Sequence, residues 1–290
     1  MAVQVAEPAI RACWRTPAAP LLPYVSAYTG YRQEAAPPSV HHGVASPHLT
    51  FLLCLDGRVD VLANADPGKA PGSFTAAVGG LHDGPARIAQ GEPQTGVQLR
   101  LTWRGARALL GLPAGALAGD TVGLDALLGR PAATLLDRLA GADGWPERFA
   151  LLDAELTALL AHGRGERGVR PEVGYAWDRL TDTGGTLRVE ELAREVGWSR
   201  RHLTEKFRAE TGLGLKAAAR VIRFEGACDR LLAPDRPSLA RVAAEAGYAD
   251  QAHLSRDFRD LAGEPATTWL SPRLTNDTPV GQEGLEQLRP

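Results

Sequence analysis

The chain has 290 residues, and its 32 Lys and Arg against 34 Asp and Glu give a formal net charge of −2. The hydrophobic content of 44% and the charged content of 23% are ordinary for globular proteins and exclude a disordered chain, a collagen and a coiled-coil rod. The longest apolar runs, such as residues 49–55, are far shorter than the roughly 20 residues that span a bilayer. No charged and apolar leader opens the sequence, so we expect a cytoplasmic protein with no membrane attachment, of about two domains.

The cysteines exclude two further classes of protein. There are three of them, Cys13, Cys54 and Cys228, and an odd, scattered set fits neither a zinc-binding pattern nor a disulfide framework. Cys54 lies in an apolar run, so a buried and inert thiol is expected there rather than a redox sensor.

Residues 1–45 are rich in Pro and Ala and show little helical periodicity. Residues 49–62 are expected to form two strands joined at Asp56-Gly57, because this dipeptide between apolar runs predicts a hairpin. The tyrosines of the first stretch, which we expect in an edge strand and a loop, are Tyr24, Tyr28 and Tyr31.

Residues 63–72 have the composition of a loop. Strand-like runs return at residues 73–78, 86–89 and 97–102, with turn residues between them. Short strands at regular spacing predict a β-sandwich or a β-barrel for this part of the chain.

Short helices are predicted over residues 104–110, 120–128 and 131–140. Pro146 can occupy the first position of a longer helix that extends to about residue 161, since its missing N–H costs nothing there. Two interpretations of its apolar stripe stay open: it covers the core of its own domain, or it pairs with a second copy of the chain. The residues of the stripe are Phe149, Leu152, Leu156, Leu159 and Leu160.

Residues 162–171 are the best domain boundary, because three glycines stand among charges before Pro171. Residues 1–161 are expected to form one domain and residues 172–272 an all-helical second domain, followed by a flexible tail over 273–290. The expected fold class is α+β, with a small amino-terminal β-barrel or sandwich, trailing helices and an all-α carboxyl-terminal part.

The helical part contains a duplication with a period of about fifty residues. The first copy, residues 192–212, is LAREVGWSRRHLTEKFRAETG, and the second, residues 242–263, is VAAEAGYADQAHLSRDFRDLAG, with one extra residue in its turn. The matched pairs are Ala193 with Ala243, Gly197 with Gly247, Trp198 with Tyr248, His202 with His253, Leu203 with Leu254, Phe207 with Phe258, and Gly212 with Gly263.

Each copy predicts a helix–turn–helix unit. Gly197 can end the first helix in the left-handed conformation, and Ser199 is placed to cap the second. Leu203 and Phe207 stand four residues apart, so both are expected to face the core. The opposite face of the second helix in each unit carries polar and charged side chains.

The duplicated unit resembles the DNA-binding domain of the AraC/XylS family of bacterial transcription regulators over residues 172–270. The segments that carry the resemblance are GWSRRHLTEKFRAETG, RFEGACDRLL and GYADQAHLSRDFRDLAGEPATTWL. The chain departs from the family at Leu215, where many members carry proline, and at Glu205, where a polar or basic base-contacting residue is frequent. The resemblance implies a sequence-specific transcription regulator that is not an enzyme.

In the family, the second helix of each unit enters the major groove of double-stranded DNA, and a long helix between them, here about residues 216–232, fixes their separation. Arg can bond guanine O6 and N7, and Gln can bond adenine N6 and N7. The implied DNA-binding residues are Arg200, Arg201, Thr204, Glu205 and Arg208 in the first unit, and Gln251, Ala252, His253, Ser255, Arg256 and Arg259 in the second.

The charge of this part is balanced, with sixteen Lys and Arg and sixteen Asp and Glu over residues 171–274. Non-specific DNA affinity comes from neutralising phosphates, so we expect it to be modest. Residues 199–208 are nevertheless basic, with four cationic side chains against Glu205 alone. Arg200, Lys206, Arg208 and Arg259 are expected to contact phosphates, which position a protein without reading sequence.

The front of the chain resembles the amino-terminal regions of a subgroup of the same family. The matching pieces are HHGVASPHLTFLLCLDG, VGGLHDGP, GVQLRLTWRGARALLGLP and WPERFALLDAEL. This resemblance implies a sensor or dimerisation domain, built as a small cupin-like β-barrel or sandwich followed by helices; no cofactor is expected. It leaves open a small-molecule effector, for which His82 and Trp103 are the candidate contacts, and also RNA polymerase and a second copy of the chain as partners.

Four histidines, His41, His42, His48 and His82, invite a metal interpretation. Neighbours in a strand point to opposite faces, which separates His41 from His42, and His82 lies in a Gly-rich turn, so surface positions are expected instead. The alternatives left open are a cupin-type metalloenzyme, a DNA-repair protein fused to a helical DNA-binding domain, and a helical interaction module. The sequence lacks HExxH, GxSxG and Walker motifs.

Overall fold

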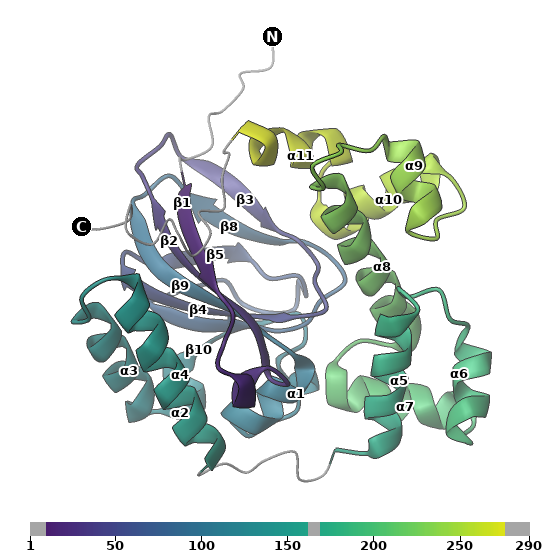
Figure 1. The fold of residues 1–290 in the computed structure, drawn as a ribbon, viewed down its shortest axis with the longest axis horizontal. Coiled ribbons are helices and arrows are strands. Elements are labelled where there is room, and N and C mark those ends of the chain that lie inside the picture. The colour runs from purple at the N-terminus through teal and green to yellow at the C-terminus, as the bar shows by residue number, and fades with distance from the viewer. Residues whose placement is uncertain (1–9, 162–168, 276–290) are drawn as a thin grey trace.

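The computed structural model of the protein describes residues 10–161 and 169–275, and the side chains of residues 10–161 and 169–270. Strands come first in the chain and helices last, so the fold class is α+β as expected. Figure 1 shows α2, α3 and α4 on one side of the β-strands and the helices from α5 to α11 on the other.

The strands form two antiparallel sheets rather than a closed barrel, so the sandwich is the form found. The first sheet has six strands in the order β1-β2-β9-β4-β7-β10, and the second has four in the order β3-β8-β5-β6. The first sheet consists of β1 (Ile10–Arg15), β2 (Val25–Gln33), β9 (Gln94–Leu101), β4 (Leu49–Asp56), β7 (Ala76–Gly79) and β10 (Thr121–Gly123). The second consists of β3 (Ser39–Gly43), β8 (Ala86–Gln90), β5 (Val59–Ala63) and β6 (Gly72–Phe74).

The alternation of side chains along β4 divides the core. Leu49, Phe51 and Leu53 point to one face of the six-stranded sheet and belong to the main apolar cluster, together with the helices. Cys54 points to the other face and packs with Val59 and other residues of the second sheet in a small separate cluster. The larger core therefore lies between the first sheet and the helices, not between the two sheets.

Three sequence predictions were wrong in detail. The segment around Asp56-Gly57 is not a hairpin, because β4 pairs with β7 and β9 while β5 pairs with β6 and β8. The tyrosine-bearing strand β2 lies between β1 and β9, so it is an interior strand, and Tyr28 is fully buried. The first half of the helix predicted over residues 120–128 is β10, which pairs with β7 and leaves only a short helix after it.

The helices of the amino-terminal part cover the six-stranded sheet. Trp145 and Phe149 of α4 pack on β2, where the ring of Trp145 meets Gly30 and that of Phe149 stacks on Tyr28 with centroids 5.9 Å apart. The stripe of α4 therefore covers its own domain, the first of the two interpretations. These elements are η1 (Ala19–Leu21), α1 (Trp103–Gly105), η2 (Ala106–Leu110), η3 (Ala114–Leu117), α2 (Leu124–Leu128), α3 (Arg130–Ala140) and α4 (Trp145–Ala161).

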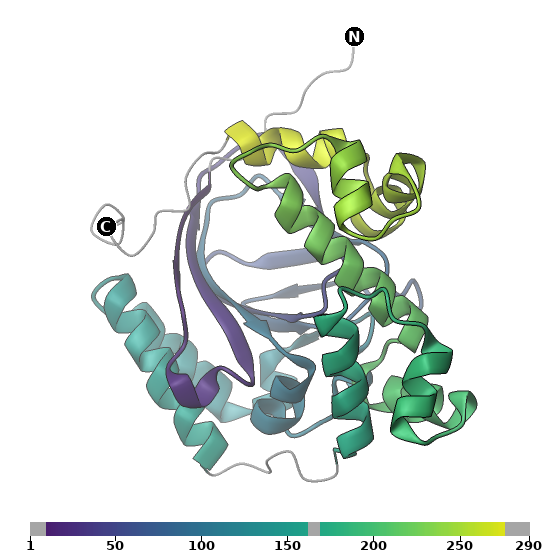
Figure 2. The ribbon, with the colours of Figure 1, turned by 45° about the vertical axis from the view of Figure 1, so that its right-hand side comes forward.

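The carboxyl-terminal part is helical throughout its described length, and Figure 2 shows α8 running from the α5–α7 group to the α9–α11 group. Most of the expected linker, residues 162–168, and most of the expected tail, residues 276–290, lie outside the described residues, whereas residues 273–275 belong to α11. The helices are α5 (Pro171–Asp182), α6 (Val189–Val196), α7 (Arg200–Thr211), α8 (Leu215–Leu231), α9 (Leu239–Glu245), α10 (Gln251–Ala262) and α11 (Ala266–Thr275).

Apart from the small cluster between the two sheets, one large cluster of buried apolar side chains includes residues of both parts, from Cys13 to Trp269. All three cysteines are buried, and no disulfide bond joins any two of them. Burial raises the pKa of Cys54 and raises that of Cys13 to about 11, so neither thiol is ionised near neutral pH. Within the described residues, no helix is both long and apolar enough to cross a membrane.

Candidate nucleic-acid interface

The first helix–turn–helix unit is α6, a short turn and α7. Gly197 ends α6 with a φ of 74°, a left-handed value that a side chain would disfavour. Ser199 then caps α7, because its side chain accepts a hydrogen bond from the His202 N–H at 3.2 Å. Both sequence predictions for this turn are confirmed.

The inner face of α7 is apolar and firmly packed. Leu203 and Phe207 are fully buried, and the Phe207 ring stacks on Trp177 of α5 with centroids 5.8 Å apart and an interplanar angle of 18°. This packing fixes α7 against its own unit and directs the opposite face of the helix to solvent.

The second unit repeats this construction with a different cap. Gly247 has a φ of 74°, and the Asp250 carboxylate accepts a hydrogen bond from the His253 N–H at 2.7 Å at the start of α10. Leu254 and Phe258 are fully buried. The sequence analysis did not predict this cap, although an Asp directly before a helix is an ordinary N-cap signal.

A network that the sequence did not reveal attaches α10 to the linker helix α8. Arg220 on α8 donates through Nε to Asp257 at 2.7 Å, and through a terminal nitrogen to Asp260 at 2.5 Å. Asp257 is only 3% exposed. Burial and then the nearby Asp257 carboxylate raise the pKa of the Tyr248 hydroxyl. The helix α10 is thus fixed on α8 by ion pairs as well as by the packing of Phe258 against Phe224.

The residues implied to bind DNA lie on the outward faces of α7 and α10. Arg201 and Arg256 are both exposed, as the reading of bases requires. The exposed members of the set are Arg200, Arg201, Glu205, Arg208, Gln251, Ala252, Arg256 and Arg259, and the half-buried members are Thr204, His253 and Ser255.

Several charges on α7 are balanced by neighbours in the same unit. Arg200 forms an ion pair of 2.6 Å with Glu190 of α6, and Lys206 one of 2.9 Å with Glu205. The Lys206 contact lowers the pKa of Glu205, so this carboxylate is ionised at neutral pH. Thr204 donates its hydroxyl proton to the Arg200 carbonyl at 2.8 Å, which leaves its oxygen lone pairs as acceptors.

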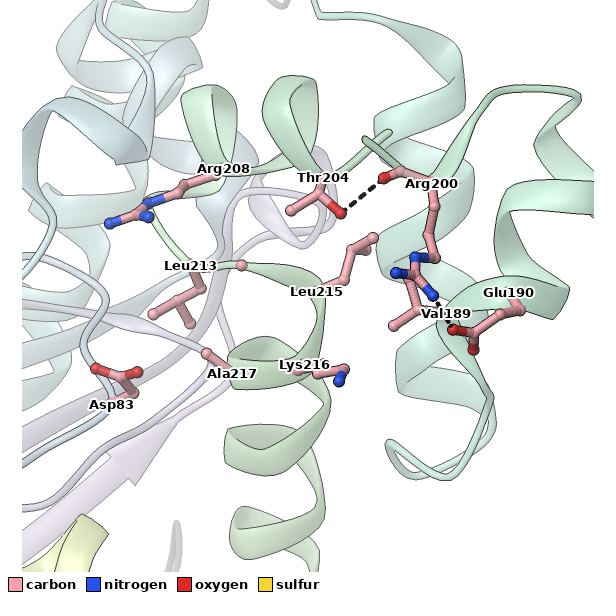
Figure 3. Close-up of a pocket in the computed structure, with 12 residues that line it drawn as sticks. Asp83, Val189, Glu190, Arg200, Thr204, Arg208, Leu213, Leu215, Lys216 and Ala217 are labelled. Carbon is pink, nitrogen blue, oxygen red and sulfur yellow. Dashed lines mark hydrogen bonds and ion pairs between the residues drawn. The ribbon is translucent and has the colours of Figure 1, made fainter. Parts of the chain in front are cut away.

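A groove of about 480 Å³ lies along the outward side of α7 at its junction with α8. Figure 3 shows the Arg200–Glu190 pair on one side of this junction and Arg208 with Asp83 on the other. Asp83 belongs to the amino-terminal part, between β7 and β8. The groove is therefore lined by the outward face of α7, by residues of α6 and α8, and by a side chain of the amino-terminal part.

The candidate effector and metal residues are scattered. Trp103 is fully buried between the two parts, 6.1 Å from Trp177 between ring centroids. His82 contacts the carbonyl of Gly84 through Nδ1, and its burial lowers its pKa, so the ring is neutral at pH 7. Among residues 10–161 and 169–275, no group of three or more His, Cys, Asp or Glu side chains is arranged to hold a metal ion.

Comparison with known proteins agrees with this geometry. The family model described as a helix-turn-helix domain matches residues 192–271. No curated protein matches the sequence. Among solved structures, ToxT from Vibrio cholerae is similar, with a TM-score of 0.54 at 10% identity, over 84% of this chain and 97% of that one.

Two further ToxT structures are similar over almost their whole length. A singly substituted apo form of ToxT from Vibrio cholerae strain SCE256 has a TM-score of 0.53 at 11% identity, covering 89% of this chain and 99% of that one. ToxT from Vibrio cholerae O395 bound to (E)-4-(8-methylnaphthalen-1-yl)but-3-enoic acid has a TM-score of 0.51 at 9% identity, covering 91% and 99%. The protein thus has the ToxT fold, and its carboxyl-terminal part is a helix-turn-helix domain of the AraC type.

Proposed function

We propose that this protein is a sequence-specific transcription regulator of the AraC type, which binds double-stranded DNA through α7 and α10. The observation that supports this most is the pair of capped, firmly packed helices that present Arg201 and Arg256 to solvent from the outward faces of two matched units. Such side chains can form paired hydrogen bonds to guanine in the major groove.

The outward side chains fall into two classes of contact. Arg201, Thr204 and Glu205 in the first unit are the proposed base readers, since Arg bonds guanine and a carboxylate accepts from cytosine N4. In the second unit the proposed base readers are Gln251, Ala252, His253, Ser255 and Arg256. Arg200, Arg208 and Arg259 are assigned to phosphates, which set the position of the protein on the duplex.

The experiment that tests the function is footprinting of the purified full-length chain on the genomic DNA of its source. A regulator protects discrete sites. The logarithm of its binding constant falls linearly with the logarithm of the salt concentration, with a slope of about −0.9 for each phosphate neutralised. Protection spread evenly over the genome, or no salt-sensitive binding at all, would contradict the proposal.

The Arg256→Ala variant is expected to lose sequence preference at one base position, at a cost of about 1–3 kcal/mol of discrimination. The reason is the loss of a paired contact to one base while the phosphate contacts remain. Selection from a random duplex library measures it, with Arg236→Ala, which removes an exposed positive charge before α9, as control. An Arg256→Ala variant with unchanged affinity and preference would refute the assignment of the second unit; Arg201→Ala tests the first in the same way.

The Arg208→Ala variant is expected to weaken binding to all sequences about equally and to reduce the salt slope by about 1. Its guanidinium is assigned to a phosphate, which carries no sequence information. Titration of fluorescent duplexes over a series of salt concentrations measures both effects. Arg87→Ala on β8 is the matched control, because it removes an exposed arginine from the amino-terminal part. A change of base preference in Arg208→Ala would place this residue among the base readers instead.

The remaining assignments extend the same proposal. Residues 1–161 form a sensor or dimerisation domain, residues 172–272 the DNA-binding domain, and residues 162–171 the linker between them. ToxT has been seen with a small organic acid bound, which supports a small-molecule effector here too. RNA polymerase and a second copy of the chain are further proposed partners, and the proposed location is the cytoplasm.

A further inference from the structure

The turn of each helix–turn–helix unit contains an aromatic ring that contacts the reading helix, which is α7 in the first unit and α10 in the second. Trp198 meets the ring of His202 edge-on, with centroids 4.6 Å apart, and Tyr248 meets that of His253 at 5.0 Å. The two pairs hold equivalent positions in the duplication. Because each histidine lies in the first turn of its helix, the position of the aromatic ring affects how the reading helix is held.

An arginine lies over each of these rings. The guanidinium of Arg170, directly before α5, is 5.9 Å from the ring centroid of Trp198, and that of Arg223, on α8, is 5.4 Å from the ring centroid of Tyr248. A cation over the face of an aromatic ring is attracted to it. The first of these contacts lies inside the first unit, whereas the second starts from the helix that connects the two units.

Arg223 also reaches the first unit. A terminal nitrogen of its guanidinium donates a hydrogen bond to the carbonyl of Gly185 at 3.4 Å. Gly185 belongs to the loop between α5 and α6, residues 183–188. The same side chain therefore contacts the loop of the first unit and the aromatic ring in the turn of the second, residues 246–250.

The loop and the turn also contact each other directly. A Cβ on Gly247, in the turn, would lie 2.7 Å from Cγ2 of Thr186, and a Cβ on Gly185 would lie 2.0 Å from the Ala219 carbonyl oxygen of α8. Both glycines have a positive φ, 74° and 70°, which disfavours a side chain. The Thr186 hydroxyl donates to the Thr183 carbonyl at 2.7 Å and holds the loop in this shape. The two units thus touch at positions where glycine leaves room for the contact.

These contacts form a second connection between the units, beside the helix α8. A helix of 17 residues keeps its two ends at a nearly constant distance, but long helices bend. Since the loop and the turn both lie on the surface of α8, rotation of one unit about this helix would move Thr186 relative to Gly247. Their contact therefore restrains the angle between the two units, which the length of α8 does not.

Two half-sites on DNA impose a strict geometry on the two reading helices. One additional base pair between the half-sites moves the second by about 3.4 Å along the duplex and turns it by about 35° around the axis. Hydrogen bonds to base edges need distances of about 2.7–3.2 Å between donor and acceptor, so a fixed unit cannot read a half-site that is displaced. A unit that can rotate or tilt can follow it.

We propose that Arg223 and the contact between Thr186 and Gly247 set the spacing of the two half-sites that the protein accepts, an inference that rests on the proposed function. Arg223 is a positioning residue, which acts on the angle between α7 and α10 through the loop and the turn. Other side chains contact the bases and the phosphates. Loss of the positioning contact is expected to widen the accepted range of spacings and to leave the bases that are read unchanged.

The test compares the wild-type protein with Arg223→Ala, both as the full-length chain. Selection from a random duplex library identifies the two half-sites and their distance in the wild type. Duplexes with one base pair added or removed between the half-sites are then titrated with each protein. The wild type is expected to bind them about 5- to 150-fold more weakly, the cost of one mismatched base pair. This spacing ratio is expected to decrease several-fold in Arg223→Ala, with the same base preference within each half-site.

Arg170→Ala is the matched control, because it removes the same charge and the same kind of contact from the equivalent ring inside the first unit. A loss of affinity through net charge is common to both variants, but the spacing ratio of the control should equal that of the wild type. Three results would overturn the proposal: an unchanged ratio in Arg223→Ala, an equal decrease in Arg170→Ala, and a wild-type motif with a single half-site.

Two substitutions of Thr186 keep the test available if Arg223→Ala does not fold. Thr186→Ser removes Cγ2, which faces Gly247, and keeps the hydroxyl that donates to Thr183. Thr186→Val keeps a methyl group toward Gly247 and replaces the hydroxyl. The spacing ratio is expected to decrease in the first variant and to stay near the wild-type value in the second. Equal ratios in the two variants would show that the methyl contact does not position the units.

A measurement without DNA separates this inference from the proposed function. The amide groups of Gly185 and Tyr248 each donate a hydrogen bond inside their own unit. Their hydrogen exchange is expected to become faster in Arg223→Ala, because both segments lose a shared contact, and to stay as in the wild type in Arg170→Ala. Unchanged exchange at either amide overturns the inference. Faster exchange in Arg223→Ala, with no DNA sequence selected by the wild type or any variant, identifies the proposed function as the part that failed.

Discussion

Phe207→Ala is expected to lower the free energy of unfolding by about 3–5 kcal/mol, the usual cost of removing a buried phenyl ring. Phe207 is fully buried in α7 and stacks on Trp177. The substitution removes apolar surface from the core and leaves a cavity under α7, beside the ring of Trp177. Chemical denaturation of the full-length chain, followed by tryptophan fluorescence, measures the loss.

The duplication supplies a matched variant for this prediction. Phe258 holds the equivalent position in the second unit and is also fully buried, against Phe224 and Trp269, so Phe258→Ala should cost a similar amount. Tyr175→Ala on α5, where 46% of the residue is exposed, is the control, with a loss expected within about 1 kcal/mol. A loss below about 1 kcal/mol in Phe207→Ala would show that α7 is not packed as described.

Arg220→Ala is expected to destabilise the protein by about 3 kcal/mol at neutral pH, the lower end of the range for breaking a buried pair. The variant leaves Asp257, which is 3% exposed, as a buried charge without its guanidinium. Arg220 itself is about a third exposed, which reduces the part of the loss that comes from the arginine. Denaturation curves of wild type and variant at pH 7 measure the difference.

A matched variant distinguishes a buried charge that has lost its partner from the loss of an exposed ion pair. Arg230→Ala on the same helix breaks an exposed pair with Glu245 and should cost at most about 1 kcal/mol. A loss of stability in Arg220→Ala no larger than that in Arg230→Ala would contradict the buried-charge explanation.

The carboxyl-terminal part was predictable because its signals are local. Gly197, Ser199, Leu203 and Phe207 each act within one turn of the residues that they organise, and the second copy repeats the pattern. The outward faces follow from the inward ones, since a helix that buries one side must expose the other. The exposed positions of Arg201 and Arg256 were therefore expected from spacing alone.

The sheets were less predictable because strand pairing is decided over long sequence separations. β4 and β5 are separated by a turn that suits a hairpin, yet they diverge into different sheets: Leu49, Phe51 and Leu53 face the helices, and Cys54 joins Val59 between the sheets. The apolar pattern of β4 permits either pairing, so only the assembled core decides between them.

The balanced charge of the DNA-binding part also has a structural explanation that composition could not supply. Glu210, Asp178 and Glu225 are neutralised by arginines of the other domain, and Asp257 by Arg220. These carboxylates lie at internal contacts and not on the outward face of α7. The equal numbers of acidic and basic residues in this part therefore make that face look more acidic than it is. No spacing rule connects residues near position 100 with residues beyond 170, so these pairs were not foreseen.

The continuous row from Trp103 through Trp177 to Phe207 bears on how such regulators could be recombined. A DNA-binding module grafted onto a foreign sensor would expose Trp177, Glu210 and Glu225, all shaped to fit one particular neighbour. A protein that retains its native amino-terminal part keeps these contacts. A chimera built by exchanging the two parts needs compatible replacements at these positions to remain soluble.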